Sequence, residues 1–107
     1  MDINEAAAMR EVTEEAVGLL RTARQNPGAR ERARGLCKEA GVSLYEVATR
    51  NSLLGSYQQA MTHEVIAWIR LSRAEPVVSA DREEYLAEAR TRAAEAGLNM
   101  GAIEAFI

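Results

Sequence analysis

Apolar residues recur at spacings of three and four along the whole chain, and no segment alternates apolar and polar residues in a run rich in Val, Ile and Thr. This spacing places apolar side chains on one face of a helix. The sequence therefore predicts an all-α fold, a compact bundle of five or six helices with short connections. Start signals place the helices after Asp2, Asn26, Ser43, the segment 51–55, Ser79 and Asn99.

Length and residue usage predict a single helical domain over residues 1–107. A chain of 107 residues, 48% of them apolar, buries enough surface for a core without disulfides or metal. One Cys and one His exclude a disulfide scaffold and a zinc finger. The longest apolar run, 65–69, is far shorter than a membrane span, and the acidic start MDINE is not typical of a secretion signal. We expect a soluble cytoplasmic protein with no membrane partner.

The net charge of −3 conceals a segregation of charge along the chain. Residues 21–38 carry six basic side chains and a single acid, Glu31, whereas residues 74–107 carry three basic side chains and seven acids. The net charge argues against a protein that coats nucleic acid through bulk electrostatics. The basic segment 21–38 remains available for a contact with nucleic acid that is limited to this part of the chain.

One segment of the chain recurs at an offset of 56 residues. ARGLCKEAGVSLYEV at 33–47 matches ARTRAAEAGLNMGAI at 89–103 in its small, glycine and apolar positions. Each copy predicts a helix that ends on Gly41 or Gly97, followed by an apolar residue and by a Ser or Asn that caps the next helix. We call this pattern, a helix that ends on glycine followed by a capped second helix, the corner. Duplication of an ancestral unit and independent use of the same corner both explain the recurrence.

The first copy carries a small residue, a glycine and two apolar residues at a characteristic spacing: Cys37, Gly41, Val42 and Val47. On these positions, about residues 30–51 resemble the helix-turn-helix motif of bacterial DNA-binding proteins. The resemblance implies that the helix after Ser43 lies in the major groove and that the preceding helix crosses the phosphate backbone.

This resemblance implies a set of DNA contacts. Phosphate contacts are expected from Arg24, Arg30, Arg34 and Lys38. Base-facing residues are expected to be Tyr45, Thr49, Arg50 and Asn51. Two residues depart from the motif, because it normally buries an apolar side chain at position 50 and because Glu46 brings a negative charge to the DNA. A homodimer is expected, since one such unit reads a short half-site.

Other residues with reactive side chains have simpler interpretations. His63 lies opposite the apolar stripe of its helix, which predicts a solvated side chain, and Cys37 lies on an alanine seam, which predicts a buried and inert thiol. No residue pattern supports a catalytic site, a metal site or a bound cofactor, and isolated glycines do not form a phosphate-binding loop. The chain is therefore not expected to be an enzyme.

Two functions remain open at the level of sequence. The first is a small regulatory protein that binds double-stranded DNA through the segment 30–51. The second is a non-enzymatic protein-interaction module: an adaptor, an assembly subunit or an inhibitor of a larger complex. Either the acidic C-terminal half or the alanine-rich helix faces would then make the contact, and the basic residues would only form a solvated surface.

Overall fold

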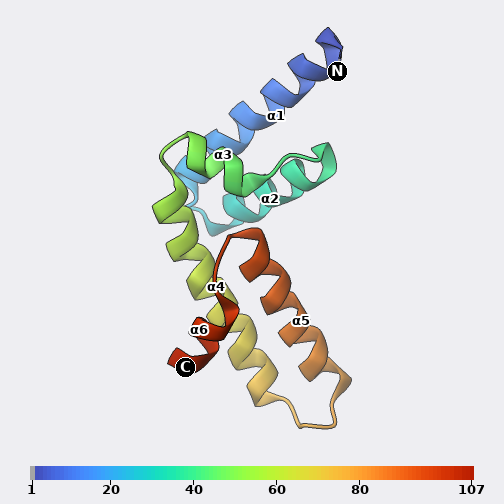
Figure 1. Ribbon diagram of the computed structural model, residues 1–107, viewed down its shortest axis with the longest axis vertical. Helices are drawn as coiled ribbons and strands as arrows, with labels where there is room; N and C mark the ends of the chain where they lie inside the picture. The colour runs from blue at the N-terminus through green and yellow to red at the C-terminus, as the bar shows by residue number, and fades with distance from the viewer. Residues whose placement is uncertain (1) are drawn as a thin grey trace. The chain divides into compact units, whose positions relative to one another are not determined.

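The computed structural model describes residues 2–107, and all regular structure in that range is helical. Six helices follow one another with short connections: α1 Ile3–Thr22, α2 Pro27–Ala40, α3 Leu44–Arg50, α4 Leu54–Ala74, α5 Ala80–Glu95 and α6 Met100–Phe106 (Figure 1). The predicted all-α fold is confirmed. None of these helices is long and apolar enough to cross a membrane.

The described chain divides into two compact units, which we call unit 1, ending at Leu54, and unit 2, Gly55–Ile107. The prediction of one domain over residues 1–107 stays a prediction, and each unit is described by itself. Unit 1 holds α1, α2 and α3, and unit 2 holds nearly all of α4 together with α5 and α6. Each unit thus consists of a long helix, a shorter helix and a seven-residue helix.

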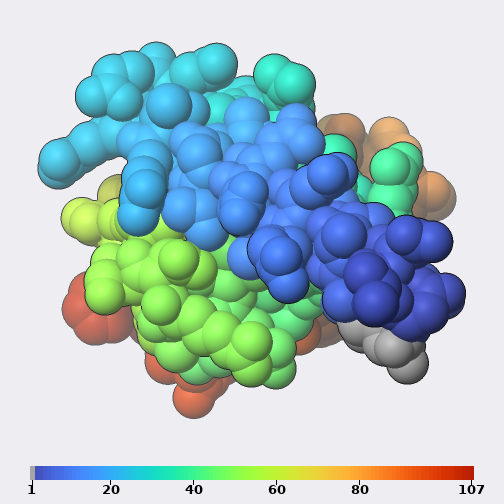
Figure 2. Space-filling model, turned by 90° about the horizontal axis from the view of Figure 1, so that it is seen from above, coloured from blue at the N-terminus to red at the C-terminus, as the bar shows by residue number. Residues whose placement is uncertain are grey.

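Unit 1 is built on the packing of α1 against α2, with α3 in contact with both. The buried positions of α2 are small side chains, which permit close approach of the helices. The outer side of α1 is uncovered (Figure 2). The buried residues of the three helices are Ala16, Val17, Leu20, Ala29, Ala33, Cys37, Leu44, Val47 and Ala48.

Unit 2 has a core cluster that joins α4 and α5. Val65 and Ile69 from α4 and Ala89 and Ala93 from α5 are fully buried in it. The hydroxyl of Ser72 on α4 also donates a hydrogen bond of 2.8 Å to the carbonyl oxygen of Arg82 on α5. Partly buried side chains pack around this cluster: Trp68, Leu98, Met100, Ile103 and Ile107.

Two expectations about local structure are wrong. The apolar residues gathered at the C-terminus, Met100, Ile103, Phe106 and Ile107, predict a segment that docks as a whole. Phe106 does not follow this expectation: its side chain is 94% exposed, because it lies on the side of α6 that faces away from the cluster. Asn26 precedes α2 as expected, yet its side chain makes no capping hydrogen bond. Pro27 at the start of α2 has no N–H, which leaves one donor fewer to cap.

Candidate functional site

The turn between α2 and α3 has the predicted corner geometry. Gly41 adopts a left-handed conformation with φ of 69°, and the N–H of Val42 donates to the carbonyl oxygen of Cys37 at 2.8 Å. Ser43 then caps α3, because its Oγ accepts a hydrogen bond of 3.2 Å from the N–H of Glu46. The corner fixes the direction in which α3 leaves α2.

Burial divides α3 into two faces. Leu44, Val47 and Ala48 are buried, which anchors the helix to unit 1. The opposite face is exposed to solvent and carries Tyr45, Glu46, Thr49 and Arg50. The first turn of α3 is therefore accessible to a partner, as a nucleic-acid contact through this helix would require.

Several side chains expected to contact DNA already make hydrogen bonds within the chain. The Nη1 of Arg34 lies 3.3 Å from the Oε1 of Glu31, and the Arg34 side chain is only 17% exposed. Thr49 donates its hydroxyl to the carbonyl oxygen of Tyr45 at 2.8 Å, and Asn51, which is half-buried, donates its Nδ2 to Val47 at 2.7 Å. These groups would have to exchange partners before they contacted a base or a phosphate.

Of the remaining predicted DNA contacts, Arg30 is half-buried. Arg24, Lys38, Tyr45 and Arg50 are exposed. Exposed acids also lie on α2 and α3, at Glu31, Glu39 and Glu46. The solvent-facing charge of this region is therefore mixed rather than uniformly basic.

The turn between α5 and α6 repeats the same geometry in unit 2. Gly97 has a φ of 68°, and the N–H of Leu98 donates to the carbonyl oxygen of Ala93 at 2.8 Å. Asn99 caps α6, with its Oδ1 accepting from the N–H of Ala102 at 3.0 Å. The sequence recurrence is therefore a structural recurrence, and it extends to the seven-residue helix that follows each corner.

The outward faces of the two short helices differ in chemistry. At the offset of 56 residues, the exposed face of α3 corresponds to Gly101, Ala102, Ala105 and Phe106 on α6, all of which are exposed. Polar and charged side chains in unit 1 are thus matched by small or apolar side chains in unit 2. The corner geometry by itself does not specify a nucleic-acid contact, because it also occurs without a basic surface.

A cluster around Arg92 was not found by sequence reasoning. The Arg92 side chain is 9% exposed and donates to the carboxylates of Glu64 on α4 and, at 2.7 Å, Glu88 on α5. Its guanidinium carbon lies 5.5 Å from the ring centroid of Trp68, which in turn lies 5.9 Å from that of Tyr85. The spacing of four between Glu88 and Arg92 was a visible signal for one of these pairs.

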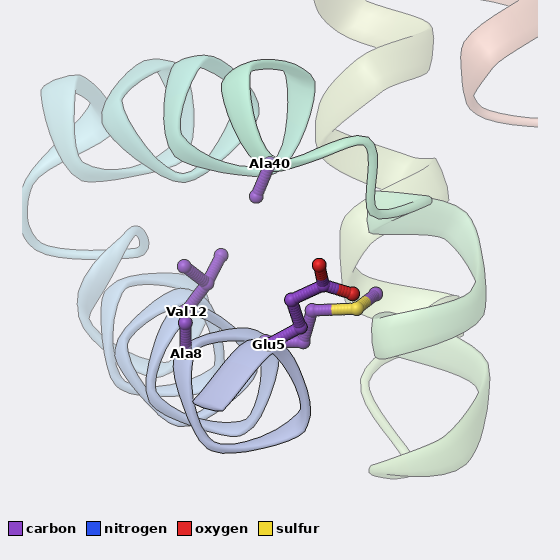
Figure 3. A pocket seen from close by; sticks show the side chains of 5 residues that line it. Glu5, Ala8, Val12 and Ala40 are labelled. Carbon is purple, nitrogen blue, oxygen red and sulfur yellow. The ribbon is translucent and has the colours of Figure 1, made fainter. Parts of the chain in front are cut away.

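The structure also forms a hollow in unit 1, of about 320 Å³, between the N-terminal half of α1 and the end of α2. Figure 3 shows Ala40 facing α1 across this space. Among the residues from 2 onward that line it, Glu5 contributes a carboxylate and the others, Ala8, Met9, Val12 and Ala40, are apolar. It brings together no pair of groups that could act as acid and base or as nucleophile and base.

Reactive side chains elsewhere lie where the sequence predicts them. Cys37 is buried, and desolvation raises the pKa of its thiol, which makes it a poor nucleophile. His63 is exposed. Within residues 2–107 no three His, Cys, Asp or Glu side chains are grouped so that they could hold a metal ion.

Comparison of the chain with known proteins finds no match: neither a family model, nor a curated protein, nor a solved structure resembles it at a significant level.

Proposed function

We propose that the chain is a non-enzymatic protein-interaction module and that unit 2 carries the contact surface. The observation that supports this most is the set of large apolar side chains exposed on unit 2. Phe106 is 94% exposed, and Val77 and Val78 in the connection between α4 and α5 are 82% and 96% exposed. Full burial of each of these side chains against a partner would stabilise the complex by about 1.5–3 kcal/mol.

Unit 1 serves as an internal control for these three positions. Phe106 corresponds to Arg50 at the offset of the repeat, and Val77 and Val78 precede the cap of α5 as Arg24 and Gln25 precede the cap of α2. All three counterparts are polar and exposed. A unit of this architecture therefore does not need apolar residues at these places for folding, and contact with a partner is the role that we propose for them.

The charge of unit 2 indicates the chemistry of the partner. Residues 55–107 carry eight acids and five basic side chains. An apolar contact within an acidic surface favours a partner whose contact area is apolar at its centre and basic at its rim. We assign the chain no catalytic step, since no nucleophile, base and orienting group come together among the described residues of either unit.

The test replaces each apolar residue by its counterpart in unit 1. The variant Val77→Arg, Val78→Gln, Phe106→Arg and the unaltered chain are immobilised and exposed to lysate of the source cells, with and without nuclease. We expect the unaltered chain to retain a protein after nuclease treatment and the variant to lose it. A matched control, Arg24→Ala with Arg50→Ala in unit 1, should retain it. Loss of all retained protein on nuclease treatment would contradict the proposal.

The exposed first turn of α3 favours DNA binding as a second candidate function. Arg24, Lys38 and Arg50 are the exposed basic residues of the predicted DNA contacts, and Tyr45 lies on the same outward face as Arg50. If double-stranded DNA is the partner, each phosphate contact contributes about 0.9 to the slope of log K against log salt. Alanine at the three basic positions should then reduce that slope by about 2–3. Alanine at Arg90 in unit 2 should leave it unchanged.

A further inference from the structure

We propose that the hollow of unit 1 binds a small arylalkylamine, a molecule in which an aromatic ring carries a short chain that ends in an ammonium group. The hollow lies between the first half of α1 and the end of α2 and measures about 320 Å³, which is at the lower end of the range for small-molecule pockets. This inference does not depend on the proposed function, because the proposed contact surface lies on unit 2.

The hollow exists because the first half of α1 packs less closely than the second half. The buried residues of α1 all belong to its second half: Ala16, Val17 and Leu20. Met9 and Val12, in the first half, are only half-buried. On the other side of the space, Ala40 offers a single methyl group (Figure 3). Two helices that are packed together elsewhere therefore leave room here for a further group.

The walls of the hollow are fixed without a ligand. The Oδ1 of Asp2 accepts a hydrogen bond of 2.7 Å from the N–H of Glu5, which caps the first turn of α1. At the opposite wall, the left-handed Gly41 and the bond from the N–H of Val42 to the carbonyl oxygen of Cys37 fix the end of α2. Binding would therefore require little ordering of the chain.

Unit 2 shows which kind of group this architecture packs at the corresponding place. Counted back from the last residue of each helix, Glu5 of α1 corresponds to Tyr57 of α4, and Met9 corresponds to Met61. Tyr57 and Met61 are 4% and 2% exposed, whereas Glu5 is exposed and Met9 is half-buried. Unit 2 thus buries an aromatic ring at a position where unit 1 has a carboxylate beside an open space.

The end of the second helix gives the same contrast between the units. Ala40 and Ala96 each precede the corner glycine, but Ala96 is fully buried and Ala40 is half-buried. In unit 2 the start of α4 reaches this alanine, because the Nε2 of Gln58 donates to the carbonyl oxygen of Ala96 at 2.9 Å. The counterpart of Gln58 in unit 1 is Ala6, whose side chain cannot make this bond. An aromatic ligand would supply the ring that unit 1 does not have here.

The charge of the ligand follows from Glu5. Among the described residues that line the hollow, Glu5 alone is charged, and an ammonium group donates strong hydrogen bonds to a carboxylate. The two helix ends oppose each other, since the N-terminus of α1 repels a cation and the C-terminus of α2, at Ala40, attracts one. The carboxylate therefore decides the preferred sign, and a ring with an ammonium group matches the apolar lining and Glu5 together.

The test is a titration of the full, isotope-labelled chain that is followed through its amide chemical shifts. The probe is 2-phenylethylamine, and the comparison compounds 2-phenylethanol and 3-phenylpropanoate keep the ring without the ammonium group. We expect the amine to bind with a Kd of about 0.1–1 mM, as its size allows, and to shift the amides of residues 5–12 and 40. The alcohol should bind about fivefold more weakly, and the carboxylate compound more weakly still.

Variants separate the charge of the hollow from its shape. Glu5→Gln should weaken binding of the amine about fivefold and leave that of the alcohol unchanged. The matched control Glu14→Gln, an exposed carboxylate of α1 that does not line the hollow, should change neither. Ala40→Leu fills the space from α2, and Glu5→Tyr introduces the residue of unit 2, so both should abolish binding of both compounds. Neither should lower the midpoint of thermal unfolding, because the space accommodates the added atoms.

Several results would overturn the inference. These are a Kd for the amine above about 10 mM, equal affinity for 3-phenylpropanoate, and amine binding that neither Ala40→Leu nor Glu5→Gln affects. Self-association of the unaltered chain that Ala40→Leu abolishes would assign the hollow to a second copy and would also overturn it. None of these results concerns Val77, Val78 or Phe106, so the proposed function stands or fails separately.

Discussion

Gly41 and Gly97 end their helices in the same left-handed conformation, with φ of 69° and 68°. Each is followed by an apolar residue whose N–H bonds back to the carbonyl oxygen five residues earlier, Val42 to Cys37 and Leu98 to Ala93, both at 2.8 Å. The order of helix lengths on either side of the two turns also matches, so the two units share one local architecture.

Substitution of the corner glycines tests how much their conformation contributes. Gly41→Ala should lower the free energy of unfolding by about 1–2 kcal/mol, because alanine is strained at this φ. A Cβ at Gly41 would meet no neighbour within 4 Å, so sterics add nothing to this cost. Gly35→Ala, within α2 and equally unobstructed, should instead raise stability by about 0.5–1 kcal/mol. Urea unfolding measures both, and effects of the same sign would contradict the argument.

Arg92 offers a test of the buried charge cluster. Arg92→Ala leaves the carboxylates of Glu64 and Glu88 without this partner and removes the cation that lies over Trp68. We expect a loss of about 2–4 kcal/mol, toward the lower end of the range for a broken buried pair because the acids are partly exposed. The exposed neighbour Arg90→Ala should change stability by less than about 0.5 kcal/mol. Thermal and urea unfolding measure the difference.

The buried thiol predicts a dependence of stability on pH. Desolvation raises the pKa of Cys37 above its ordinary value of 9.0 in the folded chain, whereas the unfolded chain ionises at the ordinary value. The folded state therefore binds more protons between the two pKa values. The stabilisation that results from this proton binding is fully present below the pKa of the unfolded chain. It is lost as pH rises through the pKa of the folded chain. Cys37→Ala should remove the alkaline loss, measured as the difference in unfolding free energy between pH 8 and pH 10, two values chosen to flank about 9.

Ser52, between α3 and α4, has a φ of 57°, which is unusual for a residue with a side chain. Ser52→Gly should stabilise the chain by about 1 kcal/mol because glycine adopts this conformation without strain. The matched control Gln59→Gly, at an exposed position within α4, should destabilise it by about 1 kcal/mol. If Ser52→Gly also destabilises the chain, the conformation of this turn is not a source of strain.

Local signals explain how much of the fold the sequence predicts. Helical periodicity and the start and stop residues predicted five or six helices and located the starts of α1, α2, α3, α5 and α6, because each signal acts within a few residues of the boundary it sets. The boundary between α3 and α4 was placed only within the segment 51–55. Ser43, Ser79 and Asn99 cap their helices as expected. The pairing of Arg92 with Glu64 spans 28 residues and depends on how α4 packs on α5, which no local pattern encodes.

The candidate site was predicted only in outline. The corner at Gly41 and the exposed position of Tyr45 and Arg50 agree with the sequence analysis. Sequence did not indicate that Arg34, Thr49 and Asn51 would bond within the chain, because those partners depend on the geometry of side chains. The exposure of Phe106 was missed for a related reason, since a helix that is apolar on both sides gives no signal of which side faces solvent.

The burial of Cys37 and the setting of Trp68 have a practical consequence. The sequence contains one cysteine, in unit 1, and one tryptophan, in unit 2. The rate at which a thiol reagent labels the chain will report opening of the first unit, and intrinsic fluorescence will report opening of the second. The unmodified protein thus carries one native reporter in each half, and a single sample can show whether its two halves unfold together or in sequence.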